Sequence, residues 1–256
     1  MDRGDRAMAL SEPHVLIVAG SDCSGGAGIA RDIETLAGFG LRAALAVTAV
    51  TVQTHDAVRA VELCEPGLVE AQMRAALEAN RIAAIKIGML GSRAIAERVA
   101  GVLADHAGIP VVLDPVIASS SGRPLIGPDA LDWLRENLMP LCALVTPNLP
   151  ELALLSGSAP ALTEAEIGRQ AKLLLAAGTR AILAKGGHAE GTEAADLLFR
   201  PLVEPLRFTS VRLRGSRRGT GCMLASGIAA GLATGKALET AIAAAKKTVS
   251  AHWCPA

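Results

Sequence analysis

The sequence predicts an α/β protein whose mostly parallel sheet is covered by helices on both faces. Short aliphatic runs alternate along the chain with amphipathic stretches of about ten residues or more. This alternation indicates parallel strands, because a strand reaches a parallel neighbour only through a crossover of that length. The first run, at residues 14–19, is apolar at every position after its histidine, which is typical of a strand buried on both faces.

The expected elements follow one another in order. The Gly-rich stretch at 20–28 ends the first strand, and Gly40 lies where a glycine caps the helix expected at 29–39. Pro66 lies where proline commonly begins a helix. By the same signals, strands are expected at 43–52, 83–87, 110–113, 143–146 and 181–185, and helices at 66–79, 93–107, 129–138, 164–177, 221–233 and 237–252.

Two segments depart from this alternation. Residues 54–63 and 196–211 contain short alternating strands with no helix between them, so they predict an edge hairpin or a small lid. No internal repeat or linker-like shift in composition divides the chain, which predicts a single domain at 14–256 after a flexible segment at 1–13. No apolar run approaches the ~20 residues of a spanning helix, and the charged start lacks the apolar core of a signal peptide, so we expect a cytoplasmic protein without a membrane partner.

The composition argues against several classes of protein. A chain of 256 residues is long enough to bury a large core without disulfides or a structural metal. Its formal net charge of +0 and its aromatic content of 2%, with no tyrosine, argue against nucleic-acid binding, which relies on a basic face and on stacking side chains. The five cysteines are scattered and form no CxxC pair, so they indicate neither a zinc site nor a disulfide framework.

The Gly-rich stretch at 20–28 is not a standard nucleotide-binding motif. A P-loop would need Lys and then Ser or Thr where this chain has Gly26 and Ala27, and a dinucleotide-binding fingerprint would need a third glycine where it has Arg31. Two interpretations stay open: a loop whose backbone lies against a ligand, or a plain strand-to-helix turn of small residues.

A second Gly cluster, at 219–221, comes directly before Cys222 and an Ala-rich helix. The free N–H groups and the dipole at a helix N-terminus favour an anion, and they lower the pKa of a thiol placed there. We therefore expect Cys222 to be partly thiolate near neutral pH and to act as a general base or a nucleophile. The alternative is a small residue that merely fills the helix start.

Polar side chains follow several of the expected strands. Asp114, Asn148 and Glu151 are placed where carboxylate and amide oxygens can hold Mg²⁺ against phosphate, although Glu151 also suits the first turn of a helix. Lys185 ends another strand, either as a phosphate-pairing cation or as a solvated terminus. Gln53 both donates and accepts, so it matches the edge of an aminopyrimidine unless it simply faces solvent. Their shared position after strands favours the functional interpretation.

Taken together, these segments resemble the hydroxymethylpyrimidine/phosphomethylpyrimidine kinases of thiamine biosynthesis, which belong to the ribokinase-like superfamily. The resemblance extends from about Val15 to His252 and rests on AGSDCSGGAGIARDIET, VTAVTVQ, KIGML, VLDPV, TPNLPE, KGGH and GTGC, in this order. It implies a three-layer α/β/α fold and a homodimer. It also implies ATP- and Mg²⁺-dependent phosphorylation of 4-amino-5-hydroxymethyl-2-methylpyrimidine, and then of its monophosphate, in thiamine diphosphate biosynthesis.

The resemblance also implies roles by position. Cys222 is similar to the family's catalytic cysteine, where most ribokinase-like enzymes have aspartate, and Lys185 would neutralise the transferring phosphoryl group. Gln53 would recognise the pyrimidine. The other contacts that it implies are Gly20, Asp22, Met89 and Val116 around the ring, Gly219, Thr220 and Gly221 on the phosphates, and Asp114, Asn148 and Glu151 on the metal.

Several positions depart from the family pattern. The loop after VLDPV has Ser120-Ser121 where the family often has Lys-Ser, Arg218 stands where a histidine usually precedes GTGC, and Met223 stands where threonine is frequent. Arg217 and Arg218 are candidate phosphate ligands, because guanidinium pairs bidentately with phosphate. Two alternatives are kept. One is a pyridoxal kinase of the same branch, which the aminopyrimidine-matching glutamine disfavours, and the other is a non-catalytic pyrimidine-binding homologue, which the departures motivate.

Overall fold

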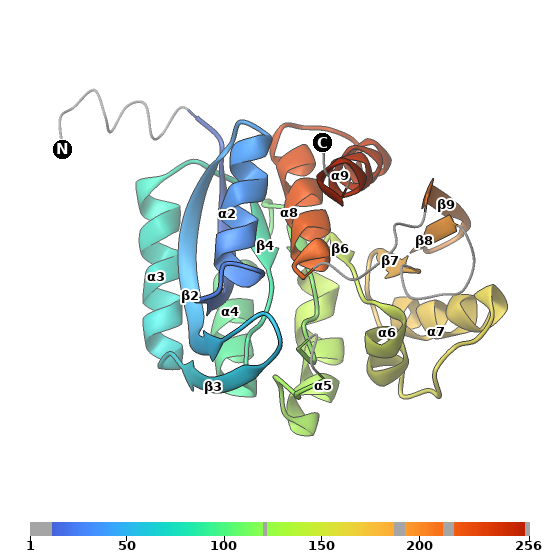
Figure 1. Cartoon of the computed structure of the whole chain (residues 1–256), viewed down its shortest axis with the longest axis horizontal. Coiled ribbons are helices and arrows are strands. Elements are labelled where there is room, and N and C mark those ends of the chain that lie inside the picture. Colours follow the sequence, from blue (N-terminus) through green and yellow to red (C-terminus); the bar gives the residue numbers. More distant parts are fainter. Residues whose placement is uncertain (1–11, 120–121, 187–192, 212–217, 254–256) are drawn as a thin grey trace.

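The computed structural model describes residues 12–119, 122–186, 193–211 and 218–253, which form one sheet with helices on both faces (Figure 1). The described strands lie in the order β3-β2-β1-β4-β5-β6-β7-β8-β9. Their bounds are β1 His14–Asp22, β2 Arg42–Gln53, β3 Val58–Leu63, β4 Ile82–Ile87, β5 Val111–Leu113, β6 Leu144–Val145, β7 Ile182–Lys185, β8 Glu193–Arg200 and β9 Val203–Val211.

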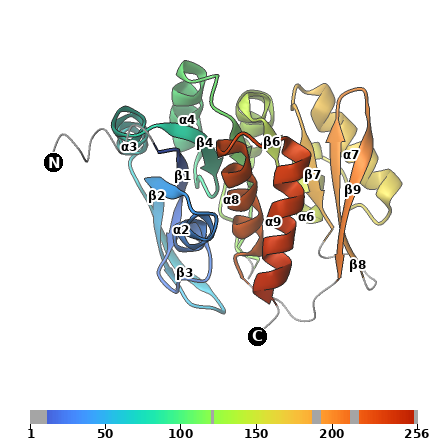
Figure 2. The ribbon, with the colours of Figure 1, turned by 90° about the horizontal axis from the view of Figure 1, so that it is seen from above.

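The helices lie in two layers, which Figure 2 shows from above. The layer of α3 to α7 packs side chains such as Met73 and Leu152 against one face of the sheet. The layer of α2, α8 and α9 packs Leu36, Ile228 and Ile242 against the other. The bounds are α2 Gly28–Gly38, α3 Pro66–Ala79, α4 Arg93–Asp105, α5 Pro128–Trp133, α6 Leu149–Ser156, α7 Glu164–Ala176, α8 Thr220–Ala233 and α9 Leu238–Trp253. The expected three-layer α/β/α architecture is confirmed.

The centre of the sheet is parallel and its two edges are antiparallel. Strand β1 pairs in parallel with β2 and β4, and the parallel pairing continues through β5 and β6 to β7. Strand β3 runs antiparallel to β2 at one edge, and β8 and β9 form an antiparallel hairpin at the other. Each of the two segments that break the sequence alternation therefore contributes an edge, as expected for hairpins.

Strand β1 is longer than the apolar run predicts. After an irregularity between Ala19 and Ser21, the chain resumes pairing with β2, where Ser21 lies opposite Val50 and Asp22 opposite Thr51. The first part of the Gly-rich stretch is therefore strand rather than loop. Because of this extension, the Asp22 carboxylate is fixed by the sheet at the end of β1.

Two helical segments differ from the expectation. Helix α6 was not among the expected helices, because its eight residues are mostly apolar and show no amphipathic period; its start does agree with the alternative that Glu151 lies in a first helical turn. The helix expected at 129–138 changes at Trp133 into a π-helical turn over Leu134–Leu138 and a 3₁₀ turn over Met139–Leu141. Pro140 explains this ending, since its ring cannot continue an α-helix.

Some of the residues singled out in the sequence lie outside the described ranges. These are residues 1–11 of the expected N-terminal segment, Ser120, Ser121, Arg217, and Gly187 and His188 of the KGGH segment. Within the described ranges, no helix combines the length and the apolar character needed to cross a membrane.

The parallel strands end at one edge of the sheet, which brings distant parts of the sequence together. Asp22, Gln53 and Lys185 are the last residues of β1, β2 and β7. Asp114 directly follows β5, and Asn148 forms an isolated bridge with Lys185 beyond the end of β6. Carboxyl ends of parallel strands are where ligands bind in such sheets.

Candidate active site

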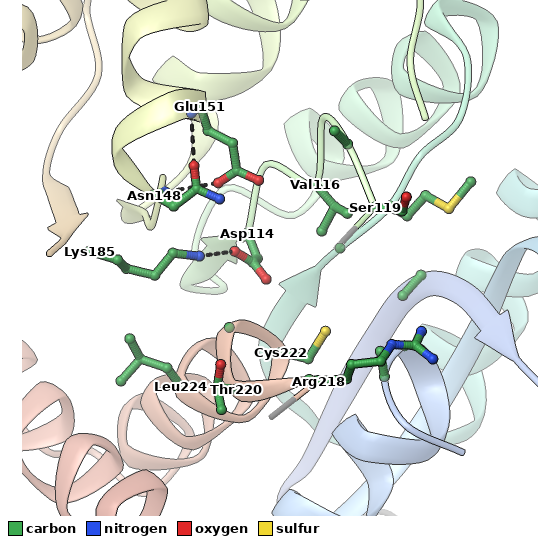
Figure 3. Close-up of a pocket in the computed structure, with 18 of the residues that line it drawn as sticks. Asp114, Val116, Ser119, Asn148, Glu151, Lys185, Arg218, Thr220, Cys222 and Leu224 are labelled. Atoms are coloured by element: carbon green, nitrogen blue, oxygen red, sulfur yellow. Dashed lines mark hydrogen bonds and ion pairs between the residues drawn. The ribbon is translucent and has the colours of Figure 1, made fainter. Parts of the chain in front are cut away.

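A cavity of about 780 Å³ opens at the carboxyl ends of the parallel strands. All of the site residues expected from the sequence line it, and Figure 3 shows several of them pointing into the same space from different elements. These residues are Gly20, Asp22, Gln53, Met89, Asp114, Val116, Asn148, Glu151, Lys185, Gly219, Thr220, Gly221 and Cys222.

At one end of the cavity, Lys185 and Asp114 form an ion pair in front of helix α8. Lys185 Nζ lies 2.7 Å from Asp114 Oδ1, and a Cβ on Gly221 would lie 3.3 Å from that ammonium. Burial by itself opposes the charged lysine, but the Asp114 and Glu151 carboxylates hold the pKa of Lys185 above its ordinary value. Lys185 is therefore an ammonium beside a helix N-terminus, an arrangement suited to binding phosphate.

Asn148 and Glu151 bind each other in a capping box at the start of α6. Asn148 Oδ1 accepts from the Glu151 backbone N–H, and Glu151 Oε2 accepts from the Asn148 N–H, both over 2.8 Å. Glu151 is thus a first-turn helix acid and a cavity residue at once. Burial raises its pKa to about 7, although Lys185 opposes that rise.

The carboxylates at the Lys185 end of the cavity fit one mode of magnesium binding. Within the described ranges, no group of three or more His, Cys, Asp and Glu side chains is arranged to hold a metal ion. Mg²⁺, however, commonly keeps several waters and binds through one or two carboxylates together with substrate phosphates. Asp114 lies close enough to Glu151 to raise the proton affinity of that carboxyl, and both side chains face the Lys185 end of the cavity. Their chemistry fits that shared mode rather than a cage made by protein alone.

The opposite end of the cavity is built around Asp22 and Gln53. Asp22 Oδ1 accepts from the backbone N–H of Ser24 over 2.9 Å and from its hydroxyl over 2.7 Å. Gln53 Nε2 donates to Asp22 Oδ2 over 3.5 Å. The single Thr51 hydroxyl proton is shared between the Ser21 carbonyl, 2.8 Å away, and Gln53 Oε1, 3.3 Å away. The amide nitrogen of Gln53 therefore faces Asp22, and its oxygen faces Thr51.

Arg218 belongs to this second end and not to the phosphate end. Its Nη2 lies 3.0 Å from Asp22 Oδ2, and its Nη1 donates to the Thr54 carbonyl over 2.6 Å. In Figure 3 its guanidinium points away from Asp114 and Lys185. The idea that Arg218 replaces a phosphate ligand does not fit this arrangement, because its donors already hold the loop that follows β1 and the end of β2.

Cys222 lies in the first turn of α8, as predicted, but its expected ionisation is wrong. Its side chain is partly accessible from the cavity, yet the surrounding protein removes most of its water. This burial raises the pKa of the thiol to about 11, even though Lys86 and a backbone N–H from Gly28 favour the thiolate. The helix N-terminus is therefore outweighed, and Cys222 is a neutral thiol near pH 7 in the unliganded protein.

The glycine before α8 is required by its surroundings. Gly219 has φ of 77°, a left-handed conformation that favours glycine, and a Cβ there would collide with the Gly26 carbonyl oxygen. This contact brings the two Gly-rich segments, which are far apart in sequence, against each other. The first of them is therefore a close-approach loop as well as a turn.

Sequence reasoning missed two charged residues beneath the cavity. Lys86 and Asp32 are both fully buried and form an ion pair with Nζ and Oδ2 2.8 Å apart. The available signal was a charged residue at a position where the pattern requires an apolar one: Lys86 lies inside a buried strand, and Asp32 lies between Ile29 and Leu36 on the buried face of α2.

Comparison with known proteins identifies the family. The sequence profile of the phosphomethylpyrimidine kinase family matches residues 22–253. The chain belongs to this family. It is 44% identical over 237 residues to the hydroxymethylpyrimidine/phosphomethylpyrimidine kinase of Rhizobium meliloti (strain 1021), a match that covers 90% of this chain and 86% of that protein.

Solved structures of two kinds resemble this member of the phosphomethylpyrimidine kinase family. The phosphomethylpyrimidine kinase of Clostridium difficile 630 aligns with a TM-score of 0.81 and 31% identity, covering 94% of this chain and 99% of that one. The pyridoxal kinase of Staphylococcus aureus in complex with AMP-PCP and pyridoxal aligns with a TM-score of 0.84 and 28% identity, covering 94% and 87%. The family resemblance and the ribokinase-like fold expected from the sequence are confirmed.

Proposed function

We propose that this chain uses ATP and Mg²⁺ to phosphorylate 4-amino-5-hydroxymethyl-2-methylpyrimidine, and then its monophosphate, for the synthesis of thiamine diphosphate. One observation carries the proposal: a single cavity joins an amide and carboxylate edge, at Gln53 and Asp22, to an anion site at the start of α8. The first end suits the ring nitrogen and amino group of an aminopyrimidine, and the second suits a transferring phosphoryl group. The name of the R. meliloti relative supports the same substrates.

In the first reaction, the residues of this chain mainly orient the substrate and stabilise charge, as phosphoryl transfer requires. We call the end of the cavity at Gln53 and Asp22 the ring end. Met89 and Val116 also line the cavity, so the pyrimidine would be held between a thioether and an aliphatic side chain. The hydroxymethyl group is then directed toward Cys222. As its oxygen bonds to the γ-phosphorus and the bond to ADP breaks, the hydroxyl proton passes to the thiolate of Cys222.

The phosphate end supplies positive charge to this step. Lys185 and the backbone N–H groups of residues 219–222 would bind the oxygens of the transferring group, and they are already in place before it arrives. Asp114 and Glu151 would hold Mg²⁺ with phosphate oxygens and water, and the ion would neutralise phosphate charge. Because the Cys222 thiol is neutral near pH 7, ligand binding has to increase the fraction of thiolate.

The pyridoxal kinase alternative is favoured by one finding, the fold similarity to pyridoxal kinases at 28% identity. Turnover of the hydroxymethylpyrimidine and of pyridoxal, measured with ATP and Mg²⁺, decides between them. We expect the pyrimidine to have the larger kcat/KM, and Gln53→Leu to lower it. Faster turnover of pyridoxal would overturn the substrate assignment, and pyrimidine binding without ATP consumption would establish a non-catalytic homologue.

The proposal extends to the state of the protein. We infer a cytoplasmic homodimer, which the family resemblance implies. Light scattering coupled to size-exclusion chromatography tests the dimer: a mass near 26.2 kDa would contradict it, and a mass near twice that value would support it.

A further inference from the structure

A hydrogen-bonded chain of buried polar groups lies behind the cavity. Ser226 Oγ donates to Asp32 Oδ1 over 2.7 Å, and Lys86 Nζ donates to Asp32 Oδ2 over 2.8 Å. All three side chains are fully buried. They come from α8, α2 and β4, so the chain connects both helices to the sheet.

The same two helices place this chain next to Cys222. Ser226 is four residues after Cys222 on α8, so the two side chains lie one turn apart on the same face. Asp32 is four residues after Gly28 on α2, and the Gly28 backbone N–H donates to the Cys222 sulfur. Each helix thus has one residue at the Cys222 sulfur and, one turn later on the same face, one residue at the Lys86–Asp32 ion pair.

Stability alone is a weak explanation for a charged pair at this place. Removing two charges from water costs so much that a buried ion pair is often no more stabilising than apolar side chains of the same volume. The pair also acts on the thiol unequally, because the effect of Lys86, which favours thiolate, exceeds the opposing effect of Asp32. Its net action on Cys222 is that of a positive charge.

We propose that Lys86 is a positioning residue for catalysis, which stabilises negative charge on the Cys222 sulfur, and that Asp32, held by Ser226, fixes the Lys86 ammonium behind it. The inference rests on the role proposed above for Cys222. It adds a group on the wall of the cavity that acts through the thiol, by setting how readily Cys222 gives up its proton.

Other charged groups also face the thiol and have to stay constant in a test. Asp114, after β5, disfavours the thiolate, while Lys185, at the end of β7, favours it. Arg218, at the start of α8, is turned to Asp22. Variants of the buried pair leave these three groups unchanged.

The test is the pH dependence of Cys222 alkylation by iodoacetamide in the unliganded protein, with each cysteine followed by peptide mass spectrometry. The rate is proportional to the thiolate fraction, so its midpoint reports the thiol directly. We expect Lys86→Met to move the midpoint upward and to slow alkylation at pH 8 at least about tenfold, the change for one pKa unit. Asp32→Asn should move the midpoint downward, because it removes the opposing negative charge.

The chain offers a matched control. Lys246 Nζ and Asp196 Oδ2 form a second nearly buried ion pair, 2.5 Å apart, and neither of them is among the groups that act on the Cys222 thiol. Lys246→Met should lower stability as Lys86→Met does and leave the Cys222 midpoint unchanged. If Lys86→Met does not fold, Asp32→Asn still tests the direction.

The outcomes separate this inference from the proposed function. An unchanged midpoint in Lys86→Met, or shifts in the same direction in both variants, overturns the role of Lys86 even when the wild-type protein is an active kinase. Opposite shifts support the electrostatic role, and the pH profile of kcat should then shift in the same directions. Full activity of Cys222→Ala would instead overturn the role of the cysteine while leaving the measured midpoints standing.

Discussion

Arg218 donates from Nη2 to the Asp22 carboxylate over 3.0 Å, which joins the residue before the Gly cluster of α8 to the last residue of β1. Both side chains are mostly buried, with 17% and 4% of their surface exposed. The same guanidinium holds the Thr54 carbonyl over 2.6 Å. The first Gly-rich segment, the end of β2 and the start of α8 are therefore fastened together at the ring end of the cavity.

This contact predicts that Arg218→Met raises the KM for the pyrimidine. Losing a charge-assisted hydrogen bond costs about 1.5–3 kcal/mol, which corresponds to roughly a tenfold to hundredfold increase in the KM for the pyrimidine. The KM for ATP should change little, and initial rates with each substrate varied in turn measure both. Arg74→Met, which breaks exposed ion pairs with Glu70 and Asp105, is the control expected to change neither. A raised KM for ATP alone would show that Arg218 serves the phosphates instead.

A pair of glycine substitutions tests the anion site at α8. Gly219→Ala should lower kcat by at least about a hundredfold, because the new Cβ collides with the Gly26 carbonyl and displaces the N–H groups of the first turn. Gly235→Ala is the matched control: its φ is 75°, close to the 77° of Gly219, but nothing lies within 4 Å of the added carbon. Equal losses of activity in the two variants would mean that backbone strain, not the collision, is responsible.

Ionisation of Cys222 predicts the alkaline side of the pH profile. Burial raises the pKa of this thiol to about 11 in the unliganded protein, and only its deprotonated form accepts a proton, so kcat/KM, which reports the free enzyme, should increase as pH rises above neutrality. Cys222→Asp should move the active range to lower pH, since a carboxyl ionises well below a thiol, and Cys222→Ala should nearly abolish turnover. A kcat/KM that is flat between pH 7 and about 9 in the wild-type protein would argue that the thiol is not the base.

Two glutamates in similar capping boxes should have opposite effects on stability as pH changes. In the folded state burial raises the pKa of Glu151 to about 7 from an unfolded value of 4.5, so its carboxyl contributes most below pH 4.5 and the contribution is lost as pH rises to 7. The loss amounts to at most about 3 kcal/mol. Glu166, which is partly exposed, has a lowered pKa because the Leu162 and Thr163 backbone N–H groups bind it, so its contribution is lost as pH falls.

Urea unfolding at pH 5 and pH 8 measures this difference. Glu151→Gln keeps an acceptor for the Asn148 N–H, so it should remove the decline in the free energy of unfolding toward pH 8. Glu166→Gln should leave that decline in place. A decline of equal size in Glu151→Gln would assign it to other groups.

Much of the fold could be predicted, because the features that encode it are local. The apolar runs and amphipathic stretches are read within a few residues, and the bounds expected for α3 agree with the structure at both ends. The parallel order then requires that Asp114, Asn148 and Lys185 meet at one sheet edge. Helix α6 was not predicted because its apolar sequence has no amphipathic period. Its start depends on the reciprocal hydrogen bonds between Asn148 and Glu151.

The parts of the site that could not be predicted depend on contacts between distant segments. Whether Arg218 faces phosphate or ring is decided by Asp22, 196 residues away in the sequence. The proton affinity of Cys222 depends on how much water the folded chain removes, which no local motif specifies. Lys86 and Asp32 are recognisable in the sequence only as misplaced charges until the fold brings them together.

The helix layer of α2, α8 and α9 also has a consequence for synthesis on the ribosome. Helix α8 packs on α2, β1 and β4, yet it is translated after nearly all of the sheet. At about 5–20 residues per second, roughly five seconds or more pass before α8 follows, and Val15, Ile17 and Val112 lack the packing of α8 during that time. A nascent chain that has completed β7 thus contains most of the sheet with one apolar face still uncovered, and it lacks Cys222 and the N-terminus of α8.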